Sequence, residues 1–260
     1  MSDYLNGIWN ARHFWRHLAQ AELRYKFRRS KLGIIWTMIY PLLLTAMMAV
    51  VFGSLFKQPV RDFAPYVFSG VLTWEFLVSS VIGGCQSLLV SEAYIKQYKH
   101  PFAIYPLKTN MVNIYTFLLA LPGLALWILF IKPANLLVGL LAMPLSILLI
   151  FMLGWPIVLI VSFLNLKYRD FGQVSGLLMQ LIWYGSPVFY DPKMLNSPTL
   201  IAVLELNPVT HILNLVRAPM LYGQFPALMD YAFVLATMLF FYLLALFMIW
   251  RSEKTLIYYF

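Results

Sequence analysis

Glu75 is the one ionisable side chain inside the long apolar stretches of this 260-residue chain. A charged group at the centre of a bilayer costs about 2.5–3.5 kcal/mol on insertion scales, so such a residue is a candidate functional group by default. A proton-driven pump usually needs a relay of such groups, and a single carboxylate gives it little support. Two interpretations stay equally open: a functional role, or a partly solvated carboxylate near a wet interior or an interface.

Other reactive side chains occur in patterns that give little support to catalysis. The chain has no Gly-Lys pair, and therefore no phosphate-binding loop of the Walker A type. HExxH, DxD and GxSxG are also missing from the sequence, and no histidine lies within an apolar stretch. The segment GQVSG at 172–176 has the small-residue spacing of close helix packing, either within one subunit or at a dimer face. We therefore expect no catalytic residue, cofactor site or metal site in this chain.

Aromatic residues make up 17% of the chain. Most rings in a membrane protein belong to interfacial belts or to the packed core. Sugar rings, however, present apolar C–H faces that stack on aromatic rings, so an aromatic-lined conduit would let a polar polymer slide without tight hydrogen bonds. Our candidates for such a conduit are Trp36, Tyr40, Trp74, Phe76, Trp183 and Tyr184. Spacing alone leaves open which of these rings face a conduit.

The elements that carry these residues require a lipid environment. Hydrophobic residues make up 62% of the chain and charged residues 11%, compared with about 25% charged residues in soluble domains. We therefore predict an all-α polytopic membrane protein, with a single transmembrane domain over 1–260. Six membrane-spanning helices are predicted, at about 33–56, 64–90, 109–131, 138–164, 171–190 and 231–250.

The distribution of basic residues predicts the orientation of these spans. An even number of spans places both termini on one side of the membrane. That side holds fourteen of the 19 Lys and Arg residues, in 1–32, 92–108, 167–170 and 251–260. The positive-inside rule makes it the cytoplasmic side. The same distribution accounts for most of the net charge of +9 without a nucleic-acid partner.

The amino-terminal segment 1–32 has the spacing of an amphipathic helix. Ile8, Trp9 and Trp15 share one face with other apolar residues, although Arg12 interrupts it. A basic helix that carries Trp normally lies in the membrane interface. Docking of a cytoplasmic partner and plain lipid anchoring both fit this pattern.

A second segment outside the spans is the cytoplasmic loop 91–108. It can form a short helix that Ser91 caps, with Glu92 in its first turn and Pro101 after its end. A short exposed helix at a membrane face can fit the cleft of a partner, and an ordinary surface loop is an equal alternative.

The external segment 191–230 contains two short apolar helices. Ser197–Pro198 and Asn207–Pro208 each resemble a cap followed by proline at the first helical position, and Gly223 can close the second helix. Helices of about 9 and 15 residues would be roughly 14 and 22 Å long, too short for a ~30 Å hydrocarbon core. Two helices that dip into the membrane must have their broken backbone buried in protein or beside a wet cavity. This segment therefore suggests an external gate.

Three motifs resemble, in the same order, the permease subunits of ABC transporters that export polysaccharides. LRYKFRRSKLGIIWTMIYPLL at 23–43 resembles the basic, Leu-Gly, Trp and Pro start of the first span in that family. LNLKYRDFG at 164–172 resembles the Arg-Asp turn before its fifth span, and ELNPVTHILNLVRAPMLYG at 205–223 resembles its external Asn-Pro…Arg segment. The resemblance covers nearly the whole chain.

This resemblance implies a homodimer of six-span subunits in a bacterial cytoplasmic (inner) membrane, with both termini in the cytoplasm. Two copies of a separate ATPase subunit would bind ATP and Mg and dock below, while the conduit would form between the two permeases. The implied cargo is a glycan on a lipid carrier such as a polyprenyl diphosphate; O-antigen, capsule and teichoic acid all fit.

The resemblance also implies roles for individual residues. Coupling to the ATPase is expected of Trp9, Trp15, Glu92, Tyr94, Lys96, His100, Arg169 and Asp170, the last two as a local ion pair that shapes their loop. Arg24, Arg28, Arg29 and Lys31 are candidates to meet the carrier headgroup, although plain positive-inside charge explains the same cluster. Asn207, Pro208 and Arg217 are expected to cap and turn a buried gate helix rather than to contact cargo.

Two alternative functions remain at this point. A permease of the same fold could move a drug or a simple lipid, since aromatic richness favours a glycan only mildly. A membrane-embedded glycosyltransferase or acyltransferase is the alternative from another class, and the missing metal and nucleophile motifs argue against it.

Overall fold

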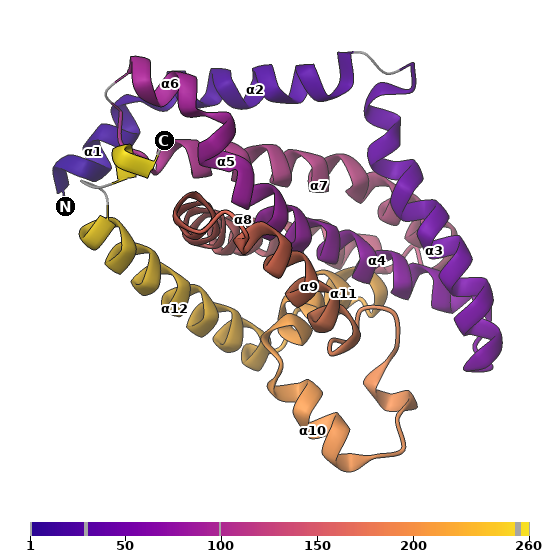
Figure 1. Ribbon diagram of the computed structural model, residues 1–260. Helices are drawn as coiled ribbons and strands as arrows, with labels where there is room; N and C mark the ends of the chain where they lie inside the picture. The colour runs from indigo at the N-terminus through magenta and orange to yellow at the C-terminus, as the bar shows by residue number, and fades with distance from the viewer. Residues whose placement is uncertain (1, 29–30, 99, 253–255, 260) are drawn as a thin grey trace.

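Helices form all the regular structure in the residues that the computed structural model describes, which are 2–28, 31–98, 100–252 and 256–259 (Figure 1). Arg29, a predicted headgroup contact, lies outside these ranges. In chain order the α-helices are α1 Ser2–Asn10, α2 Arg12–Arg28, α3 Trp36–Leu55, α4 Val60–Val78, α5 Gly84–Val90, α6 Glu92–Gln97, α7 Ile104–Ile131, α8 Asn135–Lys167, α9 Phe171–Tyr184, α10 Pro198–Leu206, α11 Pro208–Leu221 and α12 Leu228–Ser252. Short 3-10 or π turns are η1 Gly33–Ile35, η2 Ser79–Gly83, η3 Pro192–Met194 and η4 Leu256–Tyr259.

Five helical segments in the described ranges are long and apolar enough to cross a membrane. They are Gly33–Leu55, Val60–Val90, Ile104–Ile131, Asn135–Lys167 and Leu228–Arg251. The number rises to six if α10 and α11, which are bent by 82° relative to one another, form one broken span. The prediction of an all-α polytopic membrane chain is confirmed at this level, and the predicted number of six spans stays a prediction.

The predicted span at 171–190 differs from these five. Its helix, α9, has 14 residues and ends at Tyr184. A helix of that length measures about 21 Å and is shorter than the ~30 Å hydrocarbon core. The chain then continues through a buried turn at 186–189. A crossing of the membrane by this segment therefore depends on non-helical backbone and stays a prediction.

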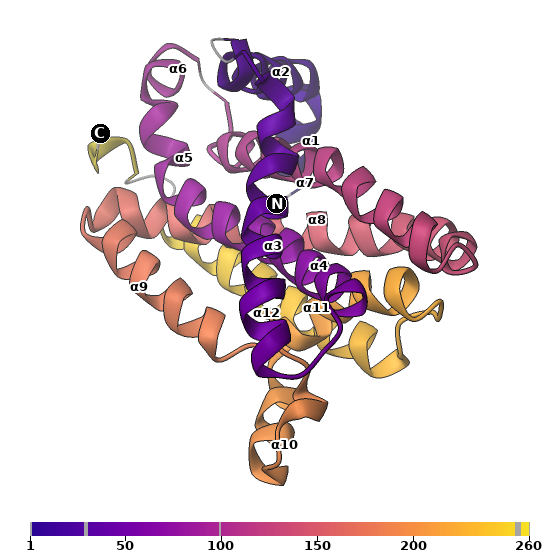
Figure 2. The ribbon, with the colours of Figure 1, turned by 90° about the vertical axis from the view of Figure 1, so that its right-hand side faces the viewer.

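Helix α8 is the central element of the bundle. It packs against α5, α7, α11 and α12, which surround it in Figures 1 and 2. The helix begins at Asn135, three residues before the predicted start of the fourth span, and continues through Pro144 and Pro156 to Lys167. Its 33 residues span about 50 Å, more than a hydrocarbon core requires.

Close packing of α5 against α8 depends on a residue without a side chain. A Cβ atom on Gly84 would lie 2.7 Å from the Val161 side chain and 3.2 Å from the Val158 Cα atom. The π-helical turn η2 connects α4 to α5 directly before Gly84, so the chain stays helical from Val60 to Val90. The contact fixes the half of the predicted second span that leads into α6.

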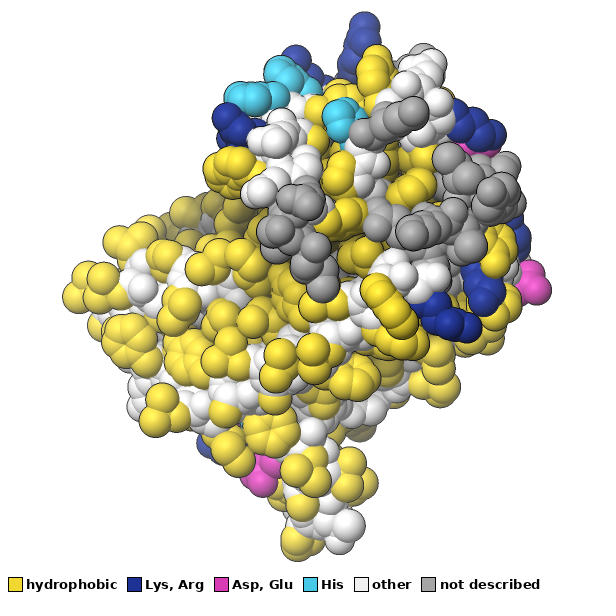
Figure 3. Space-filling view, turned by 90° about the vertical axis from the view of Figure 1, so that its left-hand side faces the viewer, with side chains coloured by type: hydrophobic (Ala, Val, Ile, Leu, Met, Phe, Trp, Pro, Cys, Tyr) yellow, Lys and Arg dark blue, Asp and Glu magenta, His cyan; other side chains and the backbone are white. Residues whose placement is uncertain are grey.

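Helices α1 and α2 lie across one end of the bundle (Figure 1). Basic and histidine side chains gather at this end, and apolar side chains cover most of the remaining surface in Figure 3. An ion pair fastens α2 to the bundle, with Lys108 Nζ of α7 2.6 Å from Glu22 Oε2 of α2. Lys108 is only 5% exposed, and the Glu22 carboxylate is its ion-pair partner.

Replacing Glu22 with Gln should therefore lower the thermal stability of the purified protein. Loss of one partner of a buried pair costs about 3–5 kcal/mol, and we expect a smaller loss because Glu22 is partly exposed. Tryptophan fluorescence during thermal unfolding in detergent measures the change.

The exposed pair between Lys96 and Glu92 provides the matched control. Glu92→Gln should change stability by about 0–1 kcal/mol. A second Lys108→Met substitution should restore much of the stability lost in Glu22→Gln, and equal effects of Glu22→Gln and Glu92→Gln would contradict the assignment.

Candidate functional site

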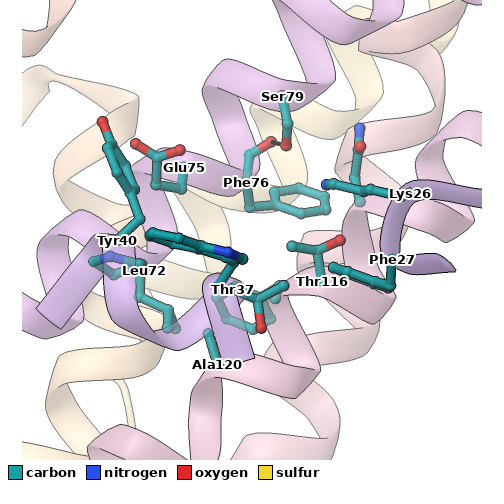
Figure 4. A pocket seen from close by; sticks show the side chains of 14 residues that line it. Lys26, Phe27, Thr37, Tyr40, Leu72, Glu75, Phe76, Ser79, Thr116 and Ala120 are labelled. Atoms are coloured by element: carbon teal, nitrogen blue, oxygen red, sulfur yellow. Dashed lines mark hydrogen bonds between the residues drawn. The ribbon is translucent and has the colours of Figure 1, made fainter. Parts of the chain in front are cut away.

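Two hollows lie beside Glu75. One lies where α3, α4 and α7 converge, and the other lies between α3, α4 and α9. The first, named the Lys26 hollow, has a volume of about 230 Å³. Figure 4 shows the side chains that line it. They come from α2, α3, α4, η2 and α7: Lys26, Phe27, Trp36, Thr37, Tyr40, Pro41, Leu72, Glu75, Phe76, Ser79, Asn113, Thr116, Phe117 and Ala120.

The second hollow, named the Tyr184 hollow, has a volume of about 350 Å³ and lies between α3, α4 and α9. Its lining comprises Tyr40, Leu44, Met48, Trp74, Glu75, Val78, Ile82, Gly176, Met179, Gln180, Trp183 and Tyr184. Tyr40 and Glu75 line both hollows and form the wall that they share.

The structure brings all six predicted conduit aromatics to these two hollows. Trp36 and Tyr184 are 49% and 62% exposed, and Tyr40 is also exposed. Trp74 and Phe76 are nearly buried, so each presents only part of its ring. The rings are therefore available to a ligand to very different degrees. Passage of a cargo along them stays a prediction.

Two of these rings belong to an aromatic cluster that joins α4 to α9. The Trp74 and Trp183 rings meet edge to face with centroids 5.3 Å apart. Phe189, which the sequence did not single out, stacks on Trp183 at 5.8 Å. Such pairs contribute about 0.5–1.5 kcal/mol beyond the burial of their area. The cluster therefore holds α9 and the turn after it against α4.

Glu75 lies half-buried on α4 and points toward Tyr40 in Figure 4. Within the described part of the chain, no Lys, Arg or His lies within ion-pair distance of its carboxylate. Lys26 lines the same hollow from α2, on its opposite side in Figure 4. The carboxylate thus faces open space rather than a protein cation.

The two predicted docking segments contact each other at the end of the bundle where α1 and α2 lie. Phe14 of α2 packs on Tyr94, Tyr98 and His100, with ring centroids 6.3, 5.5 and 4.8 Å away. The pattern analysis included Tyr94 and His100 but missed Phe14, because that residue lies off the apolar face used to judge the helix. The amphipathic helix and the loop 91–108 therefore form one continuous surface.

The two tryptophans of the amphipathic helix have different environments. Trp9 is 63% exposed, and the Arg12 guanidinium lies 5.5 Å from its ring centroid. Trp15 is buried, and its Nε1 donates a hydrogen bond to the Ile8 carbonyl at 3.1 Å. Trp9 can thus meet a partner directly, whereas Trp15 shapes the bend between α1 and α2.

The short helix α6 forms as predicted, but its predicted cap is wrong. The Ser91 hydroxyl donates to the Ser87 carbonyl at 2.8 Å instead of accepting from the first turn of α6. Glu92 stands in that first turn and pairs with Lys96 one turn later. Helix α5 ends at Val90, directly before Ser91, so the Ser87 carbonyl one turn earlier lies within reach of the Ser91 hydroxyl.

The predicted ion pair between Arg169 and Asp170 is also wrong for the chain as described, since neither side chain has an ion-pair partner there. Both are exposed in the turn between α8 and α9. Asn165 shapes this turn instead. Its Nδ2 donates to the Cys85 carbonyl at 2.8 Å, and its Oδ1 accepts from the Gly172 N–H at 2.9 Å.

The predicted headgroup cations Arg24, Arg28 and Lys31 are exposed at and after the end of α2. Lys26, which was not among them, is the cation of this segment that lines a hollow beside Glu75. Helical geometry explains the difference, since residues two positions apart on a helix point in different directions.

Asn207 fixes the bend in the external segment. Its Oδ1 accepts from the Val209 N–H at 2.9 Å, which confirms the predicted cap, and Pro208 occupies the first position of α11. Its Nδ2 also donates to the Gly185 carbonyl and to Ser186 Oγ. One side chain therefore joins α11 to the turn that follows α9.

The first of the two external caps is wrong. As far as the structure describes the chain, Ser197 stands at the start of α10 without a side-chain cap bond, although Pro198 occupies the first helical position as predicted. Gly223 follows α11 with a φ of +63°, as expected for the residue that closes a helix. A side chain there would also meet Asn135 Oδ1 at 2.5 Å.

Arg217 of α11 is 2% exposed and holds the same turn from a second point. Its guanidinium donates to the Pro187 and Val188 carbonyls, both at 2.7 Å. The guanidinium carbon also lies 3.8 Å from the centroid of the Tyr66 ring. A Cβ atom on Gly70 would lie 2.0 Å from the Val188 carbonyl oxygen, so only glycine admits the turn here. These contacts fit the expected structural role.

A buried cluster around His211 closes the external segment and was missed from sequence. His211 Nδ1 lies 2.7 Å from Asp230 Oδ1, and Nε2 lies 2.8 Å from the Glu205 carbonyl oxygen. Asn214 Nδ2 donates to the same Asp230 oxygen at 3.0 Å. The cluster ties α10 and α11 to the start of α12. The sequence feature that could have indicated this cluster is Asp230, an acidic residue in the first turn of the long apolar helix α12.

Comparison with known proteins adds a family assignment to this geometry. Residues 13–221 match the family described as ABC-2 type transporter. A protein of Myxococcus xanthus named O-antigen export system permease protein RfbA is 26% identical over 203 residues, which cover 77% of each chain. A Klebsiella pneumoniae protein of the same name is 23% identical over 178 residues, covering 68% of this chain and 69% of that protein.

Replacing Arg217 with Lys should destabilise the protein even though the charge is kept. An ammonium group cannot reproduce a planar fork that donates to two carbonyls while it stacks on a ring. A buried acceptor left unpaired costs about 1–3 kcal/mol. The midpoint of thermal unfolding in detergent measures the loss.

The exposed Arg61 provides the control for this substitution. Arg61→Lys should leave the midpoint within error of the wild type. If Arg217→Lys unfolds at the wild-type temperature, the guanidinium does not hold the 187–188 turn in the way described.

Proposed function

Because the chain belongs to the ABC-2 type transporter family, we propose that it is the membrane-spanning subunit of an ATP-driven exporter of a lipid-linked polysaccharide. Membership implies a membrane protein that works with an ABC ATPase. The family match over 13–221 is the observation that carries the proposal. The glycan is inferred from relatives that are named for O-antigen export and from the six rings gathered at the two hollows.

We place the subunit in the bacterial inner membrane, with six crossings and both termini in the cytoplasm. The fifth crossing is α9 with its following turn, α10 and α11 form the external gate, and α12 is the sixth crossing. Support comes from Arg217 and Asn207, which bond the carbonyls of the 185–188 turn, as backbone at membrane depth requires.

The conduit would form between two copies of the chain. Exposed apolar side chains line α3 and α9, among them Met47, Leu177 and Leu181. Gly176 on α9 has open space where a Cβ atom would project, whereas Gly172 already packs on Asn165. In the GQVSG segment, Gly172 therefore packs within the subunit, whereas Gly176 is available for close packing against a second copy of the chain.

Two ATPase subunits, which would bind ATP and Mg, would dock on the joined surface of α2 and α6. The exposed Trp9, Lys96 and Arg169 are suited to direct contact. A negatively charged carrier headgroup would approach through the exposed cations at the end of α2, which include Arg24 and Arg28. The positive-inside rule explains these same charges without a headgroup.

Membership of a transporter family favours transport over the alternative of an embedded glycosyltransferase or acyltransferase. A drug or a simple lipid as cargo fits the family equally well, and the names of the relatives favour the glycan.

The proposal is tested by export in cells that lack this chain. Restoring the chain together with its ATPase should return polymer to the cell surface, and an ATPase with a disabled Walker A lysine should not. Purification of the complex should yield the permease and the ATPase in equal numbers. Surface polymer in the absence of any ATPase would overturn the proposal.

Ring removal at the exposed edge of the hollows should slow export without unfolding the protein. Trp36→Ala and Tyr184→Ala remove exposed rings, so each should lose about 1 kcal/mol or less of stability. Stacking of a nucleic-acid base on an aromatic side chain contributes about 1–3 kcal/mol. If a sugar ring makes a comparable contact, loss of the aromatic ring should lower the export rate roughly fivefold or more. Surface polymer per minute measures it.

Trp250 on α12 is the matched control because it is 80% exposed and belongs to neither hollow. Trp250→Ala should export as the wild type does. Equal losses in all three variants would indicate an effect on insertion rather than on a conduit.

Loss of the Phe14 ring should weaken the ATPase interaction. Phe14→Leu keeps an apolar side chain but removes contacts to three rings of the 94–100 segment. Each ring pair contributes about 0.5–1.5 kcal/mol, so affinity should fall roughly two- to tenfold. Titration of the solubilised permease with the ATPase subunit measures the Kd.

The exposed ring of Tyr25 on the same helix provides a control, and Tyr25→Leu should bind normally. If Phe14→Leu and Tyr25→Leu give the same Kd as the wild type, the joined surface is not the docking site.

A further inference from the structure

The position of Glu75 has a chemical consequence that aromatic stacking does not explain. Its carboxylate lines both hollows, and within the described part of the chain it lacks an ion-pair partner. A carboxylate accepts hydrogen bonds and offers none. A ligand in either hollow therefore meets a hydrogen-bond acceptor that has no ion-pair partner among the described residues.

The rings around Glu75 reinforce this preference. Tyr40 shares the wall with Glu75, and Trp74 and Trp183 meet edge to face beside it in the Tyr184 hollow. The faces of aromatic rings are the negative part of their charge distribution. Hydroxyl and C–H groups of a sugar suit such faces, whereas an anionic group is repelled by the faces and by the carboxylate together.

The cations near the hollows are placed unequally. Lys26 belongs to the Lys26 hollow and lies across it from Glu75 in Figure 4. The lining of the Tyr184 hollow, in the residues that the structure describes, contains neither Lys nor Arg. For a ligand in the Tyr184 hollow, Glu75 is thus the formally charged group in the lining that the structure describes.

We propose that Glu75 accepts hydrogen bonds from hydroxyl groups of the cargo sugars and excludes acidic sugars, so that this exporter carries an uncharged glycan. The inference rests on the proposed function and narrows its substrate class. A polymer of uronic acids or sugar phosphates would bring an anion past Glu75 with every repeat unit. A phosphate headgroup passes only once per chain, and Lys26 offers it a cation on the opposite wall.

The test uses two polymers of equal length on the same lipid carrier in one bacterial host. One is a neutral mannan, and the other carries a glucuronic acid in each repeat. With its own ATPase, the wild-type chain should export the neutral polymer at least tenfold faster than the acidic one. Glu75→Gln keeps an amide oxygen as acceptor but removes the charge, so it should reduce the ratio to threefold or less through faster export of the acidic polymer.

Two further variants keep the outcome interpretable. Glu75→Asp retains the charge and should retain the discrimination, which guards against a Gln variant that fails to insert. Asp62→Asn removes an exposed carboxylate at the other end of α4 and should leave the ratio unchanged. Membrane levels of each variant are measured by immunoblotting.

Two results would overturn the inference while the proposed function stands. One is equal export of both polymers by the wild type. The other is an unchanged ratio in a normally inserted Glu75→Gln variant. Failure of the wild type to export either polymer with its ATPase would instead refute the proposed function itself, and the inference with it.

Discussion

The turn after α9 imposes the constraint on which the rest of this structure depends. Residues 186–189 are buried without belonging to a helix, so their carbonyl groups need hydrogen-bond partners outside a helical ladder. Arg217 donates to the Pro187 and Val188 carbonyls, the Val188 N–H donates to the Ser186 carbonyl, and Asn207 donates to the carbonyl of the adjoining Gly185. Arg217 and Asn207 belong to the external pair of short helices. The turn and the pair are therefore stable only together, and a change in one requires a change in the other.

That dependence also decides the position of the aromatic hollows. The turn carries Phe189, which stacks on Trp183, and Trp183 in turn meets Trp74 of α4. Because Gly70 has no side chain, the Val188 carbonyl can approach α4 closely, and the turn lies directly against this helix. Glu75 belongs to the same helix, five residues after Gly70. Displacing the external helices would thus loosen one wall of the Tyr184 hollow. The proposed gate and the proposed conduit are mechanically one unit.

Sequence patterns predicted the elements that hydrophobicity and caps determine, and missed those that tertiary contacts determine. The apolar runs gave five of the predicted spans, and Asn207 and Gly223 gave the bounds of α11, because cap chemistry is local. Ser91 and the Arg169–Asp170 pair were wrong because a nearer backbone acceptor and Asn165 compete with the local pattern. His211 and Asp230 are nineteen positions apart, and only folding brings them together.

Side-chain contacts connect the proposed ATPase-docking surface of α2 and α6 to the Lys26 hollow. Phe14 joins α2 to the segment that holds α6, and the Glu22–Lys108 pair joins α2 to the start of α7. Helix α7 then supplies Asn113 and Thr116 to the Lys26 hollow, and α2 supplies Lys26 itself. A displacement of α2 therefore moves one side of that hollow relative to α4 without unfolding any helix. Packed helices transmit such motion because they shift as units rather than bend. Under the proposed function, force from the separate ATPase would reach the Lys26 hollow through these side-chain contacts of α2 rather than through the lipid.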